Sequence, residues 1–151
     1  MEEFNTLEKV KKLFDEKGCP SSNSIYVALL KDLRKYSGMV SGMEYPYTGL
    51  LLNISDEGIG YFYLNQPKFS LRIFMEKLVV DKDSYTFIKS DDIKSIEVKK
   101  FALLDKKRRS LIIKTNNKKT HYLYGYINDE LLPYHNEEFA KLIEKYSKNK
   151  T

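Results

Sequence analysis

The residues best suited to chemistry in this chain are basic, and they are concentrated in LDKKRRSLIIKTNNKKTH, residues 104–121. Residues 106–119 hold seven of the 26 Lys and Arg residues and no Asp or Glu. The rest of the chain carries a net charge of −2, because its basic residues are outnumbered by the 21 acidic ones, whereas the whole chain carries +5. One basic patch on a slightly acidic body is typical of a local contact with an anion.

Four consecutive basic residues form the densest part of this stretch: Lys106, Lys107, Arg108 and Arg109. Guanidinium groups bind phosphate or carboxylate in bidentate fashion, so these four are the predicted anion-binding residues. The next pair, Lys118 and Lys119, follows a short strand, and at about 3.3 Å per residue it would lie roughly 20 Å away. The alternative is that both clusters are solvated strand connections, where Lys is common.

Three tyrosines alternate along THYLYGYI and share one face of a strand: Tyr122, Tyr124 and Tyr126. Leu123 and Ile127 share the opposite face, which is the better candidate for the core. A row of aromatic rings can stack against nucleic-acid bases or line a peptide groove. Ordinary cross-strand packing is the alternative, and no motif of an RNA-binding module accompanies the row.

Catalytic and metal-binding signals are weak. The two histidines, His121 and His135, are not at metal-ligand spacing, and Cys19 has no neighbouring base in the sequence. The chain contains no P-loop, dinucleotide fingerprint or nucleophile elbow. We therefore expect no enzymatic activity, no cofactor and no metal.

Helical periodicity predicts two helices before residue 48. NTLEKVKKLFDEKG begins with Asn5 as a predicted N-cap and Glu8 three residues later, a capping-box arrangement. SNSIYVALLKDLRKYSG, residues 22–38, places apolar residues on one face and ends at a glycine. A third helix is predicted near the C-terminus, in NEEFAKLIEKYSK, where Phe139, Leu142, Ile143 and Tyr146 follow an amphipathic pattern.

From residue 48 the apolar residues alternate with a period of two, which predicts strands separated by polar turns. The predicted strands are residues 48–55, 59–65, 70–80, 84–88, 93–104, 110–115 and 120–127. The apolar parity changes at Lys99–Lys100, which predicts a β-bulge or bend there. Seven short strands followed by one amphipathic helix favour a small barrel or sandwich whose open side the helix covers.

A resemblance to a known family rests on FIKSDDIKSIEVKK, residues 87–100, with apolar residues at Ile93, Ile96 and Val98. SLIIKTNNKKTHYLYGY and EEFAKLIEKY follow it in the order of a hairpin and a closing helix. With this pattern, residues 48–147 resemble a bacterial pleckstrin-homology-like domain related to GRAM domains. The resemblance implies a mainly β fold of the α+β class: a seven-stranded bent barrel with a C-terminal capping helix. We expect the two N-terminal helices, within residues 1–47, to precede this domain at 48–151.

The resemblance also implies a binding scaffold, since many such domains bind phosphoinositide headgroups, membranes or peptides. Their usual headgroup site lies at the first strand–turn–strand. Here that segment is LLLNISDEGIGYFYL, whose turn holds Asp56 and Glu57 and no basic residue. The usual headgroup site is therefore not carried over to this chain.

Taken together, these patterns predict a non-catalytic binding module that contacts an anionic membrane surface or an acidic protein segment through residues 106–109. One alternative is nucleic-acid binding through the basic hairpin and the tyrosine face. Another is a self-associating interaction protein without a ligand, dimerising through its N-terminal helices. The single cysteine and the absence of a long apolar run lead us to expect a cytoplasmic protein, peripheral at the membrane.

Overall fold

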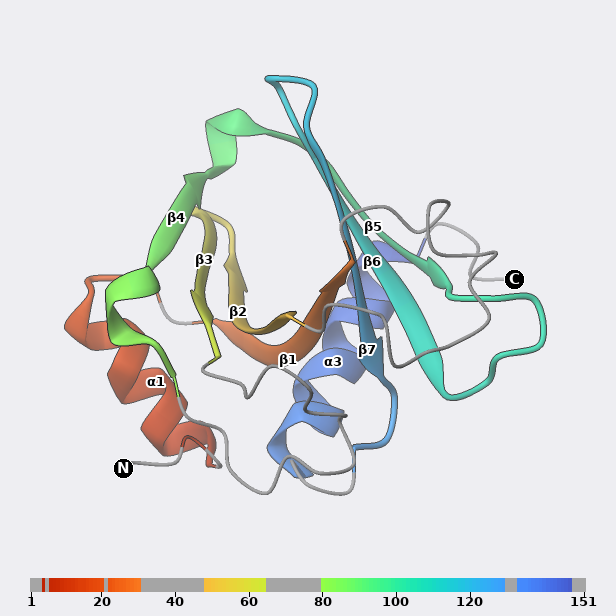
Figure 1. The fold of residues 1–151 in the computed structure, drawn as a ribbon, viewed down its shortest axis with the longest axis horizontal. Coiled ribbons are helices and arrows are strands. Elements are labelled where there is room, and N and C mark those ends of the chain that lie inside the picture. The colour runs from red at the N-terminus through yellow and green to blue at the C-terminus, as the bar shows by residue number, and fades with distance from the viewer. Residues whose placement is uncertain are drawn as a thin grey trace.

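The computed structural model describes residues 4, 6–20, 22–30, 48–64, 80–129 and 133–147 (Figure 1). Its helices are α1 (Leu7–Glu16) and α3 (Pro133–Tyr146), with short 3-10 turns η3 (Lys82–Ser84) and η4 (Ser90–Asp92). Its strands are β1 (Asn23–Leu30), β2 (Thr48–Ser55), β3 (Gly58–Tyr63), β4 (Thr86–Lys89), β5 (Ile93–Lys100), β6 (Arg108–Thr115) and β7 (Thr120–Tyr126).

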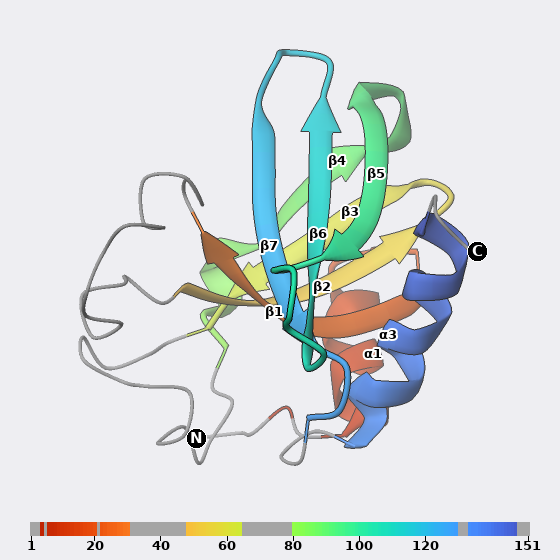
Figure 2. The same ribbon diagram turned by 90° about the vertical axis from the view of Figure 1, so that its right-hand side faces the viewer.

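All neighbouring strands are antiparallel, in the spatial order β4-β3-β2-β1-β7-β6-β5. The sheet has a four-stranded half, β1 to β4, and a three-stranded half, β5 to β7, whose strands cross those of the first half in Figure 2. The halves meet where β1 pairs with β7, at Ala28 with Tyr124, Leu29 with Leu123 and Leu30 with Tyr122. We call this short pairing the seam.

The predicted fold class is wrong in two respects. First, the sheet does not close into a barrel, because β4 and β5 stand at opposite ends of the strand order and do not pair with each other. Second, one helix rather than two precedes the sheet in the part of the chain that the structure describes, because residues 23–30 form strand β1. The rest of the predicted second helix lies outside the described residues.

Strand β1 was mistaken for a helix because its apolar run is continuous. Ile25 and Val27 are fully buried, and the β-branched side chains of this segment suit a strand. A short buried strand and a buried helical segment cannot be separated by periodicity alone. β1 pairs with β2 along most of its length, so the predicted division at residue 48 falls between two paired strands.

Apolar side chains form two clusters, one on each face of the four-stranded half. The first packs Val10, Leu13 and Phe14 of α1 against Leu51 of β2 and Phe62 of β3. The second fills the space between the two halves and is covered by α3. It includes Ile25, Val27, Leu50, Leu52, Ile54, Ile59, Val98, Leu111, Ile113, Leu123, Phe139 and Leu142. Strand β2 is therefore buried on both faces.

Helix α3 forms where the sequence predicts it and lies across the seam. Phe139 and Leu142 are buried at 0% and 1% exposure, whereas Ile143 and Tyr146 are half-buried. The ring of Phe139 lies against Gly125 of β7, where an added Cβ would stand 3.1 Å from ring carbons. The same Cβ would stand 3.5 Å from Cγ1 of Val27 in β1, so Gly125 lies between Phe139 and Val27 beside the seam.

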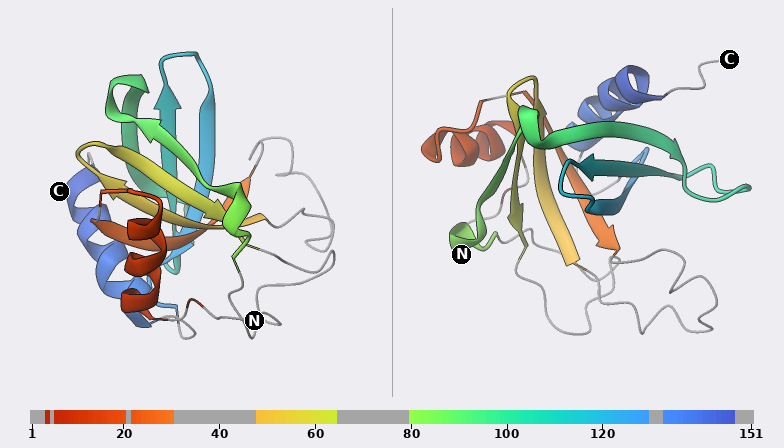
Figure 3. Two further views of the ribbon diagram at one scale, coloured as in Figure 1. Left: turned by 90° about the vertical axis from the view of Figure 1, so that its left-hand side faces the viewer. Right: turned by 90° about the horizontal axis from the view of Figure 1, so that it is seen from above.

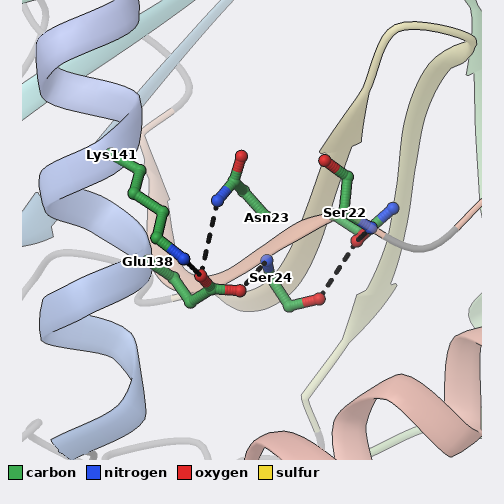
Figure 4. A network of polar contacts seen from close by, with 6 residues as sticks. Ser22, Asn23, Ser24, Glu138 and Lys141 are labelled. Atoms are coloured by element: carbon green, nitrogen blue, oxygen red, sulfur yellow. Dashed lines mark hydrogen bonds and ion pairs between the residues drawn. The ribbon is translucent and has the colours of Figure 1, made fainter.

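A buried carboxylate also fixes α3 to β1 (Figure 4). Glu138, 4% exposed, accepts hydrogen bonds from the backbone N–H of Ser24 and from Asn23 Nδ2, both at 3.4 Å. Lys141, one turn further along the helix, lies 3.2 Å from the same carboxylate. The described part of β7 pairs only with residues 28–30 of β1, so this carboxylate takes the place of a neighbouring strand for Ser24.

Two local predictions need correction. The N-cap of α1 is Thr6, whose hydroxyl accepts the Lys9 N–H at 3.3 Å, and not Asn5, which lies outside the described residues. The register of β5 shifts between Ile93 and Ser95, and not at Lys99–Lys100, where the strand ends regularly. The parity change in the sequence thus marks the end of a strand. The predicted strand at 70–80 lies outside the described residues except for Val80, which forms a bridge with Leu64.

Candidate functional site

The connection between β5 and β6, residues 101–107, projects beyond the sheet (Figure 3, right). Its turn is closed by a hydrogen bond from the Asp105 N–H to the carbonyl of Ala102, at 3.1 Å. Its end is held to the segment after β7 by a hydrogen bond of 2.8 Å from the Ile127 N–H to the carbonyl of Lys107. We call residues 101–107 the β5–β6 loop.

Two adjacent leucines are exposed in this loop. Leu103 is 85% exposed and Leu104 is 88% exposed, and they are the exposed large hydrophobic residues of the described chain. The predicted strand at 93–104 includes both leucines, but strand β5 ends at Lys100 and leaves them in the loop. Single exposed leucines are ordinary. An adjacent pair in a projecting loop is unusual enough to need a functional explanation.

Four exposed lysines lie on either side of the leucines in sequence: Lys99, Lys100, Lys106 and Lys107. The first two end β5 and the last two end the loop. None of the four forms an ion pair with a residue that the structure describes. The anion-binding residues predicted from sequence thus include Lys106 and Lys107 but not Lys99 and Lys100, which lie outside the window of highest charge.

Arg108 is engaged within the protein and does not project like the lysines. Its Nε and Nη2 atoms lie 2.7 and 2.6 Å from Oδ2 of Asp105. Its guanidinium lies over the ring of Phe101, 4.2 Å from the centroid, and 5.7 Å from that of Tyr124. Arg109 is half-buried and donates from Nη1 to the carbonyl of Arg108 at 2.9 Å. Of the four predicted anion-binding residues, Lys106 and Lys107 are the exposed ones.

Asp105 organises the end of the loop. Its Oδ1 accepts the backbone N–H groups of Lys107 and Arg108, both at 2.9 Å, in an Asx-type turn. Burial acts to raise the pKa of this carboxyl, but the hydrogen bonds from Arg108 and the two N–H groups outweigh it and hold the pKa below its ordinary value of 3.8. The carboxylate therefore stays charged at pH 7, and the loop keeps its shape.

The predicted tyrosine face is mostly covered. Tyr124 is 4% exposed, and its ring lies 5.1 Å from that of Phe101 and 6.1 Å from that of Tyr126. Tyr122 and Tyr126 are half-buried, while Leu123 faces the core as expected. A base could stack on Tyr124 only by displacing the side chains packed on it.

The second basic pair lies away from the loop. Lys118 and Lys119 belong to the β6–β7 turn, at the opposite end of β6, and both are exposed. Lys118 has a φ of 67°, in the left-handed region, so this turn has a structural role of its own. The structure thus brings Lys106 and Lys107 together with Lys99 and Lys100, and leaves Lys118 and Lys119 apart.

Other kinds of site have little support. Among the residues that the structure describes, no group of three or more His, Cys, Asp or Glu side chains is placed to hold a metal ion. The two described helices are each too short or too polar to cross a bilayer. Comparison of the chain with protein-family models, with curated proteins and with solved structures found no match. The resemblance to pleckstrin-homology-like domains therefore stays a prediction.

Proposed function

We propose that this protein is a peripheral binding module that contacts an anionic lipid surface through its β5–β6 loop. The observation that carries the proposal is the pair Leu103 and Leu104, 85% and 88% exposed, in a projecting loop with exposed lysines on both sides. Apolar side chains flanked by basic ones suit the boundary between lipid headgroups and acyl chains. The leucines enter the apolar layer while the lysines stay among the headgroups.

The two kinds of side chain contribute by different physics. A leucine that leaves water for an apolar environment is stabilised by about 1.5–3 kcal/mol. Each lysine close to an anionic surface contributes about 1 kcal/mol, and this part falls with salt because the Debye length is only about 10 Å at 0.1 M. The expected binding is reversible, with a salt-sensitive part from the lysines and a salt-resistant part from the leucines.

The leucines favour a lipid surface over the other partners considered. An acidic protein segment or a nucleic acid would engage the lysines and leave Leu103 and Leu104 in water. Stacking of bases is also disfavoured, because the central ring, Tyr124, is 4% exposed. A second copy of the chain would cover the leucines but would bring its own lysines against those of the first copy.

Vesicle sedimentation tests the proposal. The wild-type protein should pellet with vesicles of phosphatidylcholine and phosphatidylserine, and much less with phosphatidylcholine alone. Changing Lys106 and Lys107 together to Ser should weaken binding at low salt by about 2 kcal/mol, roughly thirtyfold. Changing Leu103 and Leu104 together to Ser should weaken it at both low and high salt.

The matched control changes Lys118 and Lys119 to Ser, which removes the same charge at the other end of β6. It should leave vesicle binding close to that of the wild type. The proposal is wrong if this control is as damaging as the loop lysine variant, or if the leucine variant binds like the wild type. If the leucine variant loses a dimer that the wild type forms in sedimentation velocity, and still binds vesicles, the leucines serve self-association instead.

A further inference from the structure

A second candidate site lies between the two halves of the sheet, away from the β5–β6 loop. A cleft of about 410 Å³ opens between strands β3 and β4 on one side and the tip of the β6–β7 hairpin on the other. Figure 1 shows these elements facing each other across the upper part of the molecule. The volume falls within the range of about 300–1,000 Å³ typical of small-molecule sites.

The floor of the cleft is apolar. Tyr61, Ile88 and His121 line the cleft and also line a smaller recess of about 50 Å³. The rest of the recess is formed by core side chains, among them Leu52 and Leu123. An apolar group that enters the cleft therefore meets the edge of the main core, where its transfer from water is favourable.

The mouth of the cleft is polar, with charges of both signs. Asp92, on η4, and Lys119, on the β6–β7 turn, both line it and are both exposed. These segments are fixed to each other, because the N–H of Asn116 donates to the carbonyl of Asp92 at 2.9 Å and its Nδ2 donates to the carbonyl of Asp91 at 2.6 Å. The lining charges cancel, so the mouth offers donors and acceptors without a net charge.

His121 adds a half-buried polar group between mouth and recess. Its imidazole forms no hydrogen bond to any residue in the described parts of the chain. Burial, and then the charge of Lys119, lower its pKa below the ordinary 6.5, so the ring is neutral at pH 7. A neutral imidazole has one donor nitrogen and one acceptor nitrogen, and here both remain for a bound molecule.

We propose that this cleft binds a small amphipathic molecule whose apolar end enters the recess and whose polar head carries donors and acceptors but no net charge. A singly charged head fits less well, because Asp92 repels an anion and Lys119 repels a cation. The proposal does not depend on membrane contact, since the β5–β6 loop lies at the other end of β6. Either proposal can therefore fail alone.

Three ligands of one shape test the charge preference: hexanamide, hexanoate and hexanamidinium. They share an alkyl chain and a planar head of the same size, and at neutral pH the head is uncharged, anionic or cationic. Each is titrated into the isotope-labelled whole chain, and backbone amide shifts are followed by NMR. Hexanamide should move the amides of Ile88, Asn117 and His121 at lower concentration than either charged ligand.

Substitutions of the two charged residues at the mouth should then shift this charge preference without changing the shape of the cleft. Asp92→Asn should tighten hexanoate by about two- to fivefold relative to hexanamide, the range for an exposed charge interaction. Lys119→Gln should do the same for hexanamidinium. Lys99→Gln removes the same charge far from the cleft and should leave all three affinities unchanged.

The proposal is overturned if no ligand moves the cleft amides, or if a charged ligand binds the wild-type chain as tightly as hexanamide. It is also overturned if Asp92→Asn and Lys119→Gln give the same relative affinities as Lys99→Gln. Amide shifts of α1, which lies on the far face of the four-stranded half, show that each variant keeps its fold.

Discussion

The contact between Gly125 of β7 and Phe139 of α3 permits a quantitative test. In a strand, Ala is favoured over Gly by about 0.5–1 kcal/mol, so Gly125→Ala would stabilise the protein if space allowed. The added Cβ would lie 3.1 Å from ring carbons of Phe139, which is tighter than most Cβ contacts. Overpacking of this kind costs about 1–3 kcal/mol. The second effect is larger over most of its range, so we expect a net loss of up to about 2.5 kcal/mol.

The ring of Phe139 cannot easily move away. It is fully buried and stacks on His135 with 5.1 Å between ring centroids, and His135 Nε2 is hydrogen-bonded to the carbonyl of Tyr126 at 2.8 Å. In a Phe139→Leu background the obstructing ring carbons are gone. There, Gly125→Ala should stabilise the protein by about 0.5–1 kcal/mol, so the effect of the same change reverses in sign.

Urea unfolding followed by circular dichroism measures both effects, as a double-mutant cycle over the wild type, two single variants and the double variant. An unchanged m-value shows that the free energies can be compared. The packing argument is refuted if Gly125→Ala stabilises the wild type, or if its effect is the same in both backgrounds. If the effects of the two substitutions are additive, the ring of Phe139 does not restrict the space beside Gly125.

Three further outcomes are expected. Leu142→Ala should lower the free energy of unfolding by about 2–5 kcal/mol, because Leu142 is 1% exposed. Glu144→Ala, at an exposed position of the same helix, should change it by less than about 0.5 kcal/mol, and equal effects would mean that the helix is not docked. Glu138→Gln should destabilise the protein less than Glu138→Ala in urea unfolding, because the amide oxygen still accepts the N–H of Ser24, and the reverse order would contradict the network in Figure 4. Because the pKa of Asp105 is lowered in the folded protein, its contribution to loop stability is complete well above pH 3.8 and is lost as the pH falls through the folded-state pKa. The NMR shifts of the Lys107 and Arg108 amides should follow this titration. An inflection above pH 3.8 would show that the pKa is raised and not lowered.

Several strands could be predicted from sequence because polar turn residues separate their apolar runs, as DEG does before β3 and NNKK between β6 and β7. β6 and β7 were located as a hairpin about NNKK, and α3 was located by its amphipathic spacing. Strand β1 was missed because its apolar run, Ile25 to Leu30, is continuous, so its sequence shows no alternation. The burial of Leu51 on β2 was also missed, since it depends on α1 packing against the outer face, a tertiary contact that no local pattern contains.

Some features of the candidate site could likewise be predicted from local sequence, and others could not. The exposure of Lys106 and Lys107 follows from local charge density. The engagement of Arg108 depends on Phe101 and Tyr124, which come from other elements and could not be located from spacing. Asp105 did carry a local signal, because an Asp commonly accepts backbone N–H groups two and three residues further along. The exposure of Leu103 and Leu104 follows only from knowing where β5 ends.

The seam has a consequence for how the chain acquires its structure. Residues 28–30 pair with residues 122–124, so a nascent chain must be synthesised to at least residue 124 before the two halves can join. Until then β1 has an open edge, and the core side chains that α3 will cover face water. Contacts so distant in sequence form late, because loop closure costs entropy before any pairing is gained. In pulsed hydrogen exchange during refolding, we expect amides of the β2–β3 hairpin to become protected before that of Leu123; earlier protection at Leu123 would contradict this order.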